Sequence, residues 1–308
     1  MRKLLSAYPK WLVFALAGLL GAGLFNAGYE LLNLLIASDD DARRNVPLLV
    51  RMFHTGVWFC CPSVGVAIFI FQCQRVLLGA DSEDFIAALI RPLAVGVFLG
   101  FLSGALAECL FQVLLSSRSS ELFVETVRTI AWGLAGGGLG LTLSFVVPNL
   151  KSSRSALFGF IGGLVGGVGF ILVNFFMSGL LAASSSASDQ ELVDVAARLV
   201  GTGIIGLFIG LSVAVAEATA KEGYLRVVWG PGEFTRVNLG AKPVTVGSSR
   251  ESTIRMAASA GYPPIVATFS LQNGQATMVN HMSRTTHALR NGNKLTLGSV
   301  VIEIHLFS

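Results

Sequence analysis

Charged side chains are scarce in this 308-residue chain: Asp, Glu, Lys and Arg make up 13% of it, whereas 53% is hydrophobic. Soluble globular proteins carry about 25% charged residues, so the composition excludes an ordinary soluble enzyme. The four cysteines, Cys60, Cys61, Cys73 and Cys109, include no C-x-x-C pair, and neither a disulfide framework nor a zinc site is expected. The sequence also lacks a P-loop, a nucleophile elbow and an H-E-x-x-H motif. We therefore expect no catalytic residues, no metal and no cofactor.

Long apolar runs fill the first part of the chain. Each is at least 26 residues long, and about 20 apolar residues suffice to cross a bilayer as a helix. Barrel strands would be about ten residues long with alternating hydrophobicity, which these runs are not. The sequence predicts an all-α, six-helix transmembrane domain over residues 1–220, and a second domain over residues 221–308. The six segments lie near residues 11–37, 47–73, 85–115, 122–148, 156–183 and 192–219.

The distribution of positive charge predicts the orientation in the membrane. With the N-terminus in the cytoplasm, nine Lys and Arg residues lie on the cytoplasmic side and six outside, in the sense of the positive-inside rule. The loop at residues 184–191 has no cation and fits the outside. The first apolar run is too long for the core of a signal peptide. An even number of spans then returns the C-terminus to the cytoplasm.

Glycine is abundant and periodic in the membrane part. Of the 35 glycines, 26 lie in residues 1–220, and five predicted helices share an Arg followed by Gly five residues later. Glycines spaced by four lie on one helical stripe, and such stripes allow close helix packing in lipid. The alternative is a narrow gap, lined by glycine, that forms a pore or a lipid pathway. The predicted packing positions are Gly96, Gly100, Gly104, Gly133, Gly137, Gly159, Gly163, Gly167 and Gly203.

Charged residues within the apolar segments predict intramembrane ion pairs. By their positions in the sequence, Glu30 and Glu108 lie near the expected depth of Arg51, Arg128 and Arg198 in the membrane. Glu217 lies near the expected depth of Arg91. The sequence does not identify which residues pair. Snorkelling of the arginines to the interface and an ion or proton pathway are the alternatives. The four arginines are Arg51, Arg91, Arg128 and Arg198.

The period of the sequence becomes short and strand-like from Tyr224 onward. Residues 221–308 carry nine Lys and Arg against four Asp and Glu, a net charge of +5, whereas residues 1–220 carry −1. Many short strands at turn spacing predict a sandwich or barrel, and Asn273-Gly274 between apolar runs predicts a hairpin. The expected strands lie near 225–229, 233–237, 244–246, 253–256, 265–271, 276–279, 294–297 and 300–307.

Several short motifs in this tail occur in the order and spacing of a known family. They are Gly230 to Phe234, Val244 to Gly247, Thr253 to Met256, Ile265 to Phe269, and the closing stretch Asn291 to Gly298. With them, residues 224–308 resemble a forkhead-associated (FHA) domain, a small all-β sandwich. The whole layout resembles a bacterial group of multi-pass membrane proteins with such a domain. The resemblance implies a place in the bacterial inner membrane.

The resemblance also implies a binding site at one end of the sandwich, where FHA domains bind phosphothreonine peptides. The family's phosphate-binding arginine should follow Gly247, but this chain has Ser248 there, and its Ser-x-x-His motif is absent. Two basic residues remain on the corresponding loops, and an Arg pair grips phosphate well. The basic residues of the tail have two other interpretations. They could belong to an interaction surface that does not need phosphate, or they could attract the domain to anionic lipids. The candidate phosphopeptide or partner residues are Ser248, Arg250, Ser283 and Arg284.

These observations give two hypotheses for function. The first is a membrane scaffold or adaptor whose FHA-like module, with a degenerate phosphothreonine site, docks a cytoplasmic or membrane protein partner. The second is a channel or transporter whose glycine-rich bundle is regulated by the tail. Besides the lipid bilayer we expect a protein partner and no nucleic acid. Exposed glycine stripes would also allow a homo- or hetero-oligomer.

Overall fold

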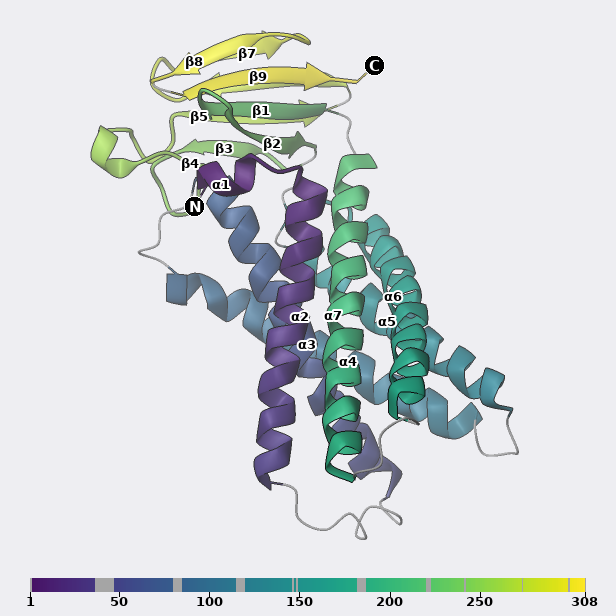
Figure 1. The fold of residues 1–308 in the computed structure, drawn as a ribbon. Helices are drawn as coiled ribbons and strands as arrows, with labels where there is room; N and C mark the ends of the chain where they lie inside the picture. Colours follow the sequence, from purple (N-terminus) through teal and green to yellow (C-terminus); the bar gives the residue numbers. More distant parts are fainter. Residues whose placement is uncertain are drawn as a thin grey trace.

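The computed structural model shows a helical bundle with a β domain at one end (Figure 1). A short helix, α1, precedes the long helices that cover the predicted apolar segments. The helices are α1 (Arg2–Ser6), α2 (Lys10–Ile36), α3 (Leu48–Leu77), α4 (Phe85–Leu114), α5 (Glu121–Ser144), α6 (Ser152–Leu181) and α7 (Ala187–Thr219). The structure describes residues 2–36, 47–79, 85–114, 120–145, 147, 149–181, 187–219, 223–240, 242–272, 274–298 and 300–307.

Within these described residues, five helices are long and apolar enough to cross a membrane: α2, α3, α4, α6 and α7. The prediction of several apolar helices followed by a β region is therefore confirmed. Helix α5 is not in this set. It contains five glycines together with Glu121, Glu125 and Arg128, and these residues lower its hydropathy.

The long helices pack in a closed ring. Each helix from α2 to α7 packs against the next along the chain, and α7 packs against α2 to close the ring. Helices α3, α5 and α7 also contact one another across the centre. In each of the neighbouring pairs α2–α7, α3–α4 and α5–α6, one helix therefore reaches the middle of the bundle.

Glycines bring the helix backbones together around this ring. A methyl group at Gly206 of α7 would overlap the backbone of Gly18 of α2, and one at Gly65 of α3 would overlap that of Gly21. The predicted positions also face neighbouring helices: Gly96, Gly100 and Gly104 of α4 face α3, Gly133 and Gly137 of α5 face α6, and Gly159, Gly163 and Gly167 of α6 face α5. A methyl group would overlap the neighbouring helix at Gly100, Gly104, Gly133, Gly159 and Gly163, and would be a tight fit at Gly96 and Gly167. At Gly137 and Gly203 it would make only ordinary contacts. These stripes face neighbours inside the chain, so they do not by themselves argue for an oligomer.

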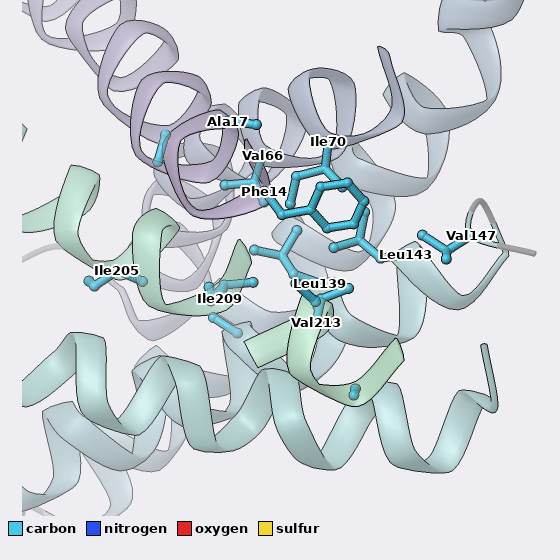
Figure 2. Close-up of a cluster of buried hydrophobic side chains, with 14 of the residues drawn as sticks. Phe14, Ala17, Val66, Ile70, Leu139, Leu143, Val147, Ile205, Ile209 and Val213 are labelled. Carbon is cyan, nitrogen blue, oxygen red and sulfur yellow. The ribbon is translucent and has the colours of Figure 1, made fainter. Parts of the chain in front are cut away.

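Large apolar side chains fill the centre of the bundle (Figure 2). Phe14 of α2, Ile70 of α3, Leu143 of α5 and Ile209 of α7 are all fully buried there. Further along the bundle, Trp132 of α5 stacks on Phe59 of α3, with ring centroids 4.7 Å apart. Helices from different parts of the chain therefore share one apolar core.

The β domain consists of two sheets over a second core. One sheet has the strand order β2-β1-β9-β8, and the other has the order β4-β3-β5-β6-β7, with β3 and β4 parallel. Fully buried residues of both sheets, such as Leu225, Ile302, Val246 and Phe269, belong to one cluster. The strands are β1 (Gly223–Gly230), β2 (Glu233–Leu239), β3 (Val244–Gly247), β4 (Ile254–Arg255), β5 (Ala267–Gln272), β6 (Gln275–Asn280), β7 (Thr285–Leu289), β8 (Lys294–Leu297) and β9 (Val300–Leu306); a single 3-10 turn, η3 (Ala258–Ala260), lies between β4 and β5.

The predicted strands correspond to observed ones, but β7 was not predicted. Its residues are exposed except for Leu289, so it shows no alternation of apolar and polar residues. It forms an edge of its sheet by pairing with β6. The predicted hairpin joins β5 to β6, where Gly274 has a φ of +76° that suits glycine; Asn273 lies outside the described residues.

Glu303 of β9 connects three strands on the outside of the first sheet. Its carboxylate lies 2.8 Å from Lys294 Nζ of β8 and 3.0 Å from Arg226 Nη1 of β1. The hydrogen bond from Lys294, with that from Arg226, lowers the pKa of the Glu303 carboxyl below its ordinary value of 4.5. These charges stabilise the order of strands β1, β9 and β8.

We predict that replacing Gly206 with Ala lowers the stability of the bundle. The added methyl group overlaps the backbone of Gly18, and overpacking of this kind costs about 1–3 kcal/mol. Gly23 lies in open space, so Gly23→Ala is the matched control. Thermal unfolding in detergent should show a lower Tm for Gly206→Ala alone; equal Tm values for the two variants would contradict the packing described above.

We also predict that Glu303 makes the β domain sensitive to acid. Because its pKa is lower in the folded state, folding favours the carboxylate, and the stabilisation is fully present above the ordinary value of 4.5. It is lost as the pH falls through the lowered pKa. Glu303→Gln should be less stable at pH 7, by up to about 1 kcal/mol, and should lose less stability on acidification. Urea unfolding of the full chain at pH 7 and pH 3.5 measures the stability at neutral pH and its loss on acidification. An equal loss of stability for Glu303→Gln and the wild type would contradict this prediction.

Candidate functional site

The predicted partner residues lie at one end of the five-stranded sheet. Gly247 at the end of β3 is followed by the loop with Ser248 and Arg250, and the turn with Ser283 and Arg284 joins β6 to β7. In the strand register, the end of β3, the start of β5 and the end of β6 lie side by side. The structure therefore brings these two segments to the same edge.

The chemistry of this edge differs between its two segments. The Ser248 hydroxyl donates to the carbonyl of Tyr262, at 2.7 Å, and so supports the loop from inside. The turn between β6 and β7 is exposed: Asn280 Oδ1 accepts from the backbone amides of Met282 and Ser283, and Arg284 takes a left-handed φ of +56°. Met282 is 70% exposed. The turn thus presents an apolar side chain and a guanidinium on an ordered backbone.

Two ion pairs join α2 to α7, one at each end. Arg198 Nε of α7 lies 3.1 Å from Glu30 Oε1 of α2, and Lys10 Nζ of α2 lies 2.7 Å from Glu217 Oε1 of α7. The two pairs are about 20 residues apart along each helix, or about 30 Å at 1.5 Å per residue, which matches the hydrocarbon thickness of a bilayer. The close contacts of Gly18 with α7 lie between them.

The other charged residues predicted to pair within the membrane have different surroundings. Arg128 pairs with Glu125 of its own helix at 2.8 Å. Glu108 accepts hydrogen bonds from Thr55 of α3, at 3.1 Å, and from Gln112, at 2.8 Å. Arg51 lies half-buried in the first turns of α3, and the side chain of Arg91 in α4 lies outside the described residues.

The end of α3 enters the β domain. Leu78, the residue after the helix, belongs to the apolar core of the two sheets. The last carbonyl groups of a helix lack partners within it, and here the β domain supplies them. Thr235 Oγ1 donates to the carbonyl of Leu77 at 2.6 Å, and the amide of Arg255 donates to the carbonyl of Leu78 at 2.9 Å.

Asn149, between α5 and α6, forms a second attachment. Its Nδ2 donates to the carbonyls of Asn238 and Lys242, at 2.9 and 3.0 Å, and its Oδ1 accepts from the Lys242 amide at 3.0 Å. Asn149 has a φ of +56°, a conformation that Asn tolerates better than most residues. Asn238 in turn donates to the carbonyl of Glu217 in α7, at 3.1 Å.

The N-terminal segment adds a third attachment. Arg2 pairs with Glu233 at the start of β2. Its guanidinium also lies over the ring of Trp229, 4.2 Å from the centroid. The ends of α3 and α7, the α5–α6 connection and α1 therefore all contact the β domain, which caps the end of the bundle where α2 begins and α7 ends (Figure 1).

The sequence does not predict this junction. In the sequence, Lys10 is one of the nine Lys and Arg residues expected on the cytoplasmic side, and Asn149 and Thr235 belong to no recognisable motif. Their roles arise from the meeting of segments that are distant in sequence, and only the break in hydropathy after each span indicated where the junction would lie. Among the residues that the structure describes, no group of three His, Cys, Asp or Glu side chains is placed to hold a metal ion.

We predict that Asn149→Ala loosens the junction. The Lys242 amide loses its acceptor, and its hydrogen exchange should accelerate by up to about tenfold, as expected for the loss of one hydrogen bond. Asn291→Ala is the matched control, because Asn291 Oδ1 accepts from the Leu306 amide instead. Exchange measured by mass spectrometry should change at Lys242 in the first variant and at Leu306 in the second; unchanged exchange at Lys242 in Asn149→Ala would refute this attachment.

The chain was compared with known proteins in three ways. No family model matches it, and no curated protein or solved structure matches it significantly. The geometry of the sheet edge, the bundle and the junction between them therefore carries the functional conclusion.

Proposed function

We propose that this protein is an integral membrane scaffold that holds an FHA-like β domain in a fixed orientation for a protein partner. The observation that carries this proposal is the sharing of the β-domain core by Leu78 at the end of α3. A β domain held in this way keeps one orientation relative to the bundle, unlike a domain on a flexible linker. The exposed turn with Met282 and Arg284 supplies the surface that the partner contacts.

The bundle is the membrane anchor in this proposal, with α5 as its sixth span. Helix α5 packs between α4 and α6 in the ring, and its residues Val127, Trp132 and Leu139 are buried. Six crossings bring the start of α2 and the end of α7 to the same side, in accord with the β domain, which contacts α1, just before α2, and the end of α7. That side is the cytoplasm by the positive-inside rule, and the resemblance to membrane proteins with an FHA domain implies a bacterial inner membrane.

The surface of the β domain favours a protein partner that binds without phosphate. Methionine and arginine are enriched at protein interfaces, and Met282 and Arg284 both lie in the exposed turn, with Ile265 40% exposed at the same edge of the sheet. The Ser248 hydroxyl, at the position of the family's arginine, is engaged with the Tyr262 carbonyl. The net charge of +5 favours an acidic contact segment in the partner.

The bundle gives less support to the transport alternative. Its centre is filled by Phe14, Ile70, Leu143 and other apolar side chains (Figure 2). A cavity of about 10 Å³ beside Trp132 and Thr202 has room for about one water molecule. Such packing suits an anchor.

Quantitative crosslinking in native membranes tests the scaffold proposal. We expect the double variant Met282→Ser, Arg284→Ser to lose its crosslinks to a specific neighbouring protein by about tenfold, because central interface residues carry most of the binding energy. Arg290→Ser is the control, since Arg290 is also exposed but lies beyond β7. Phosphatase treatment should leave the crosslinks in place. The same crosslinked neighbours in equal yield for the double variant would overturn the proposal.

A further inference from the structure

A cavity of about 290 Å³ lies between the bundle and the β domain. The segment before α2, the ends of α3 and α7, and strand β2 line it. One ordered water needs about 10–15 Å³, and small-molecule sites begin at about 300 Å³. The cavity therefore has the size of a ligand site.

Two side chains of the lining each keep an acceptor oxygen without a partner. Glu217 is 4% exposed and Asn238 is 2% exposed, and both line the cavity. Glu217 Oε1 accepts from Lys10, but Glu217 Oε2 and Asn238 Oδ1 have no hydrogen-bond partner among the described residues. Buried acceptors without donors are unfavourable, so a ligand that brings N–H donors to these two oxygens would be stabilised here.

A guanidinium completes the lining on the exposed side. Arg236 of β2 lines the cavity and is exposed. It lies over the rings of Tyr224 and Phe234, 5.4 and 5.8 Å from their centroids, and it forms no ion pair with any residue described here. Arginine is well suited to phosphate because its donors form a planar fork. The cavity lining thus combines two buried acceptor oxygens with an exposed guanidinium.

The cavity lies at the level where a bilayer meets water. Lys10 and Glu217 are at the ends of two candidate spans, Lys10–Leu32 and Val195–Thr219. Tyr8 and Trp11, which also line the cavity, are about half exposed, as aromatic residues at membrane interfaces commonly are. From there an exposed stripe descends along α2 at a spacing of four residues. Its members are Leu16, Leu20 and Leu24.

We propose that this cavity binds the head group of an aminophospholipid. The primary ammonium donates to Glu217 Oε2 and Asn238 Oδ1, the phosphate lies on Arg236, and the acyl chains run along the leucine stripe of α2. An ammonium has three N–H donors, whereas the trimethylammonium of a choline head group has none. The site therefore distinguishes ethanolamine from choline lipids, and the bound lipid joins the bundle to the β domain.

Native mass spectrometry of the full chain tests this inference with short-chain phosphatidylethanolamine, phosphatidylcholine and phosphatidylglycerol. We expect phosphatidylethanolamine to bind at least tenfold more tightly than phosphatidylcholine. Glu217→Gln and Arg236→Gln should each weaken phosphatidylethanolamine binding about tenfold. Arg236 is exposed, so its replacement leaves the fold intact, and Arg290→Gln is the control with the same change of charge outside the cavity.

Each of the other results would overturn the inference. Equal binding of the ethanolamine and choline lipids would mean that Glu217 Oε2 and Asn238 Oδ1 do not accept hydrogen bonds from the lipid. Phosphatidylglycerol binding as tight as phosphatidylethanolamine would mean a site for phosphate alone. Free phosphoethanolamine binding as tightly as the lipid would exclude a lipid ligand. Equal effects of Arg236→Gln and Arg290→Gln would place the lipid elsewhere.

Discussion

The carbonyl groups at the end of α3 set the relation between the two parts of this molecule. The last carbonyl groups of a helix lack partners within it. Here the Thr235 hydroxyl donates to the carbonyl of Leu77, and the Arg255 amide donates to the carbonyl of Leu78. The Leu78 side chain belongs to the β-domain core. Because α3 is also one of the three helices that meet in the middle of the bundle, a shift of the β domain would disturb both cores. The orientation of the β domain thus follows from the packing of the bundle.

That packing depends on glycine. Backbones of α2 and α7 touch near Gly18 and Gly206, and ion pairs close the same pair of helices at both ends. The close approach places Glu217 beside Lys10 and below Asn238 of β2, so the polar end of the bundle and the β domain share a cavity. The spacing of small residues along the helices therefore contributes to the geometry of the cavity at the end of the bundle.

Much of the fold could be predicted from the sequence, because hydropathy and glycine spacing are properties of single segments. The runs near residues 11–37 and 192–219 correspond to α2 and α7, and the short strands of the tail correspond to all strands except β7, whose exposed residues do not alternate. The pairing of Arg198 with Glu30 needed the order of helices in the ring, which hydropathy does not encode. The attachments made by Asn149 and Thr235 depend on contacts between segments that are distant in sequence, and no local sequence pattern predicts them.

In the proposed scaffold the bundle and the β domain form one rigid body, and pulsed electron paramagnetic resonance tests this directly. Spin labels replace two exposed arginines, Arg154 at the start of α6 and Arg290 after β7, in a variant without the four native cysteines, and the protein is reconstituted in lipid nanodiscs. A single narrow distribution of distances between the labels is the predicted result. A broad or multiple distribution would show a β domain that moves on a tether, and would contradict the account.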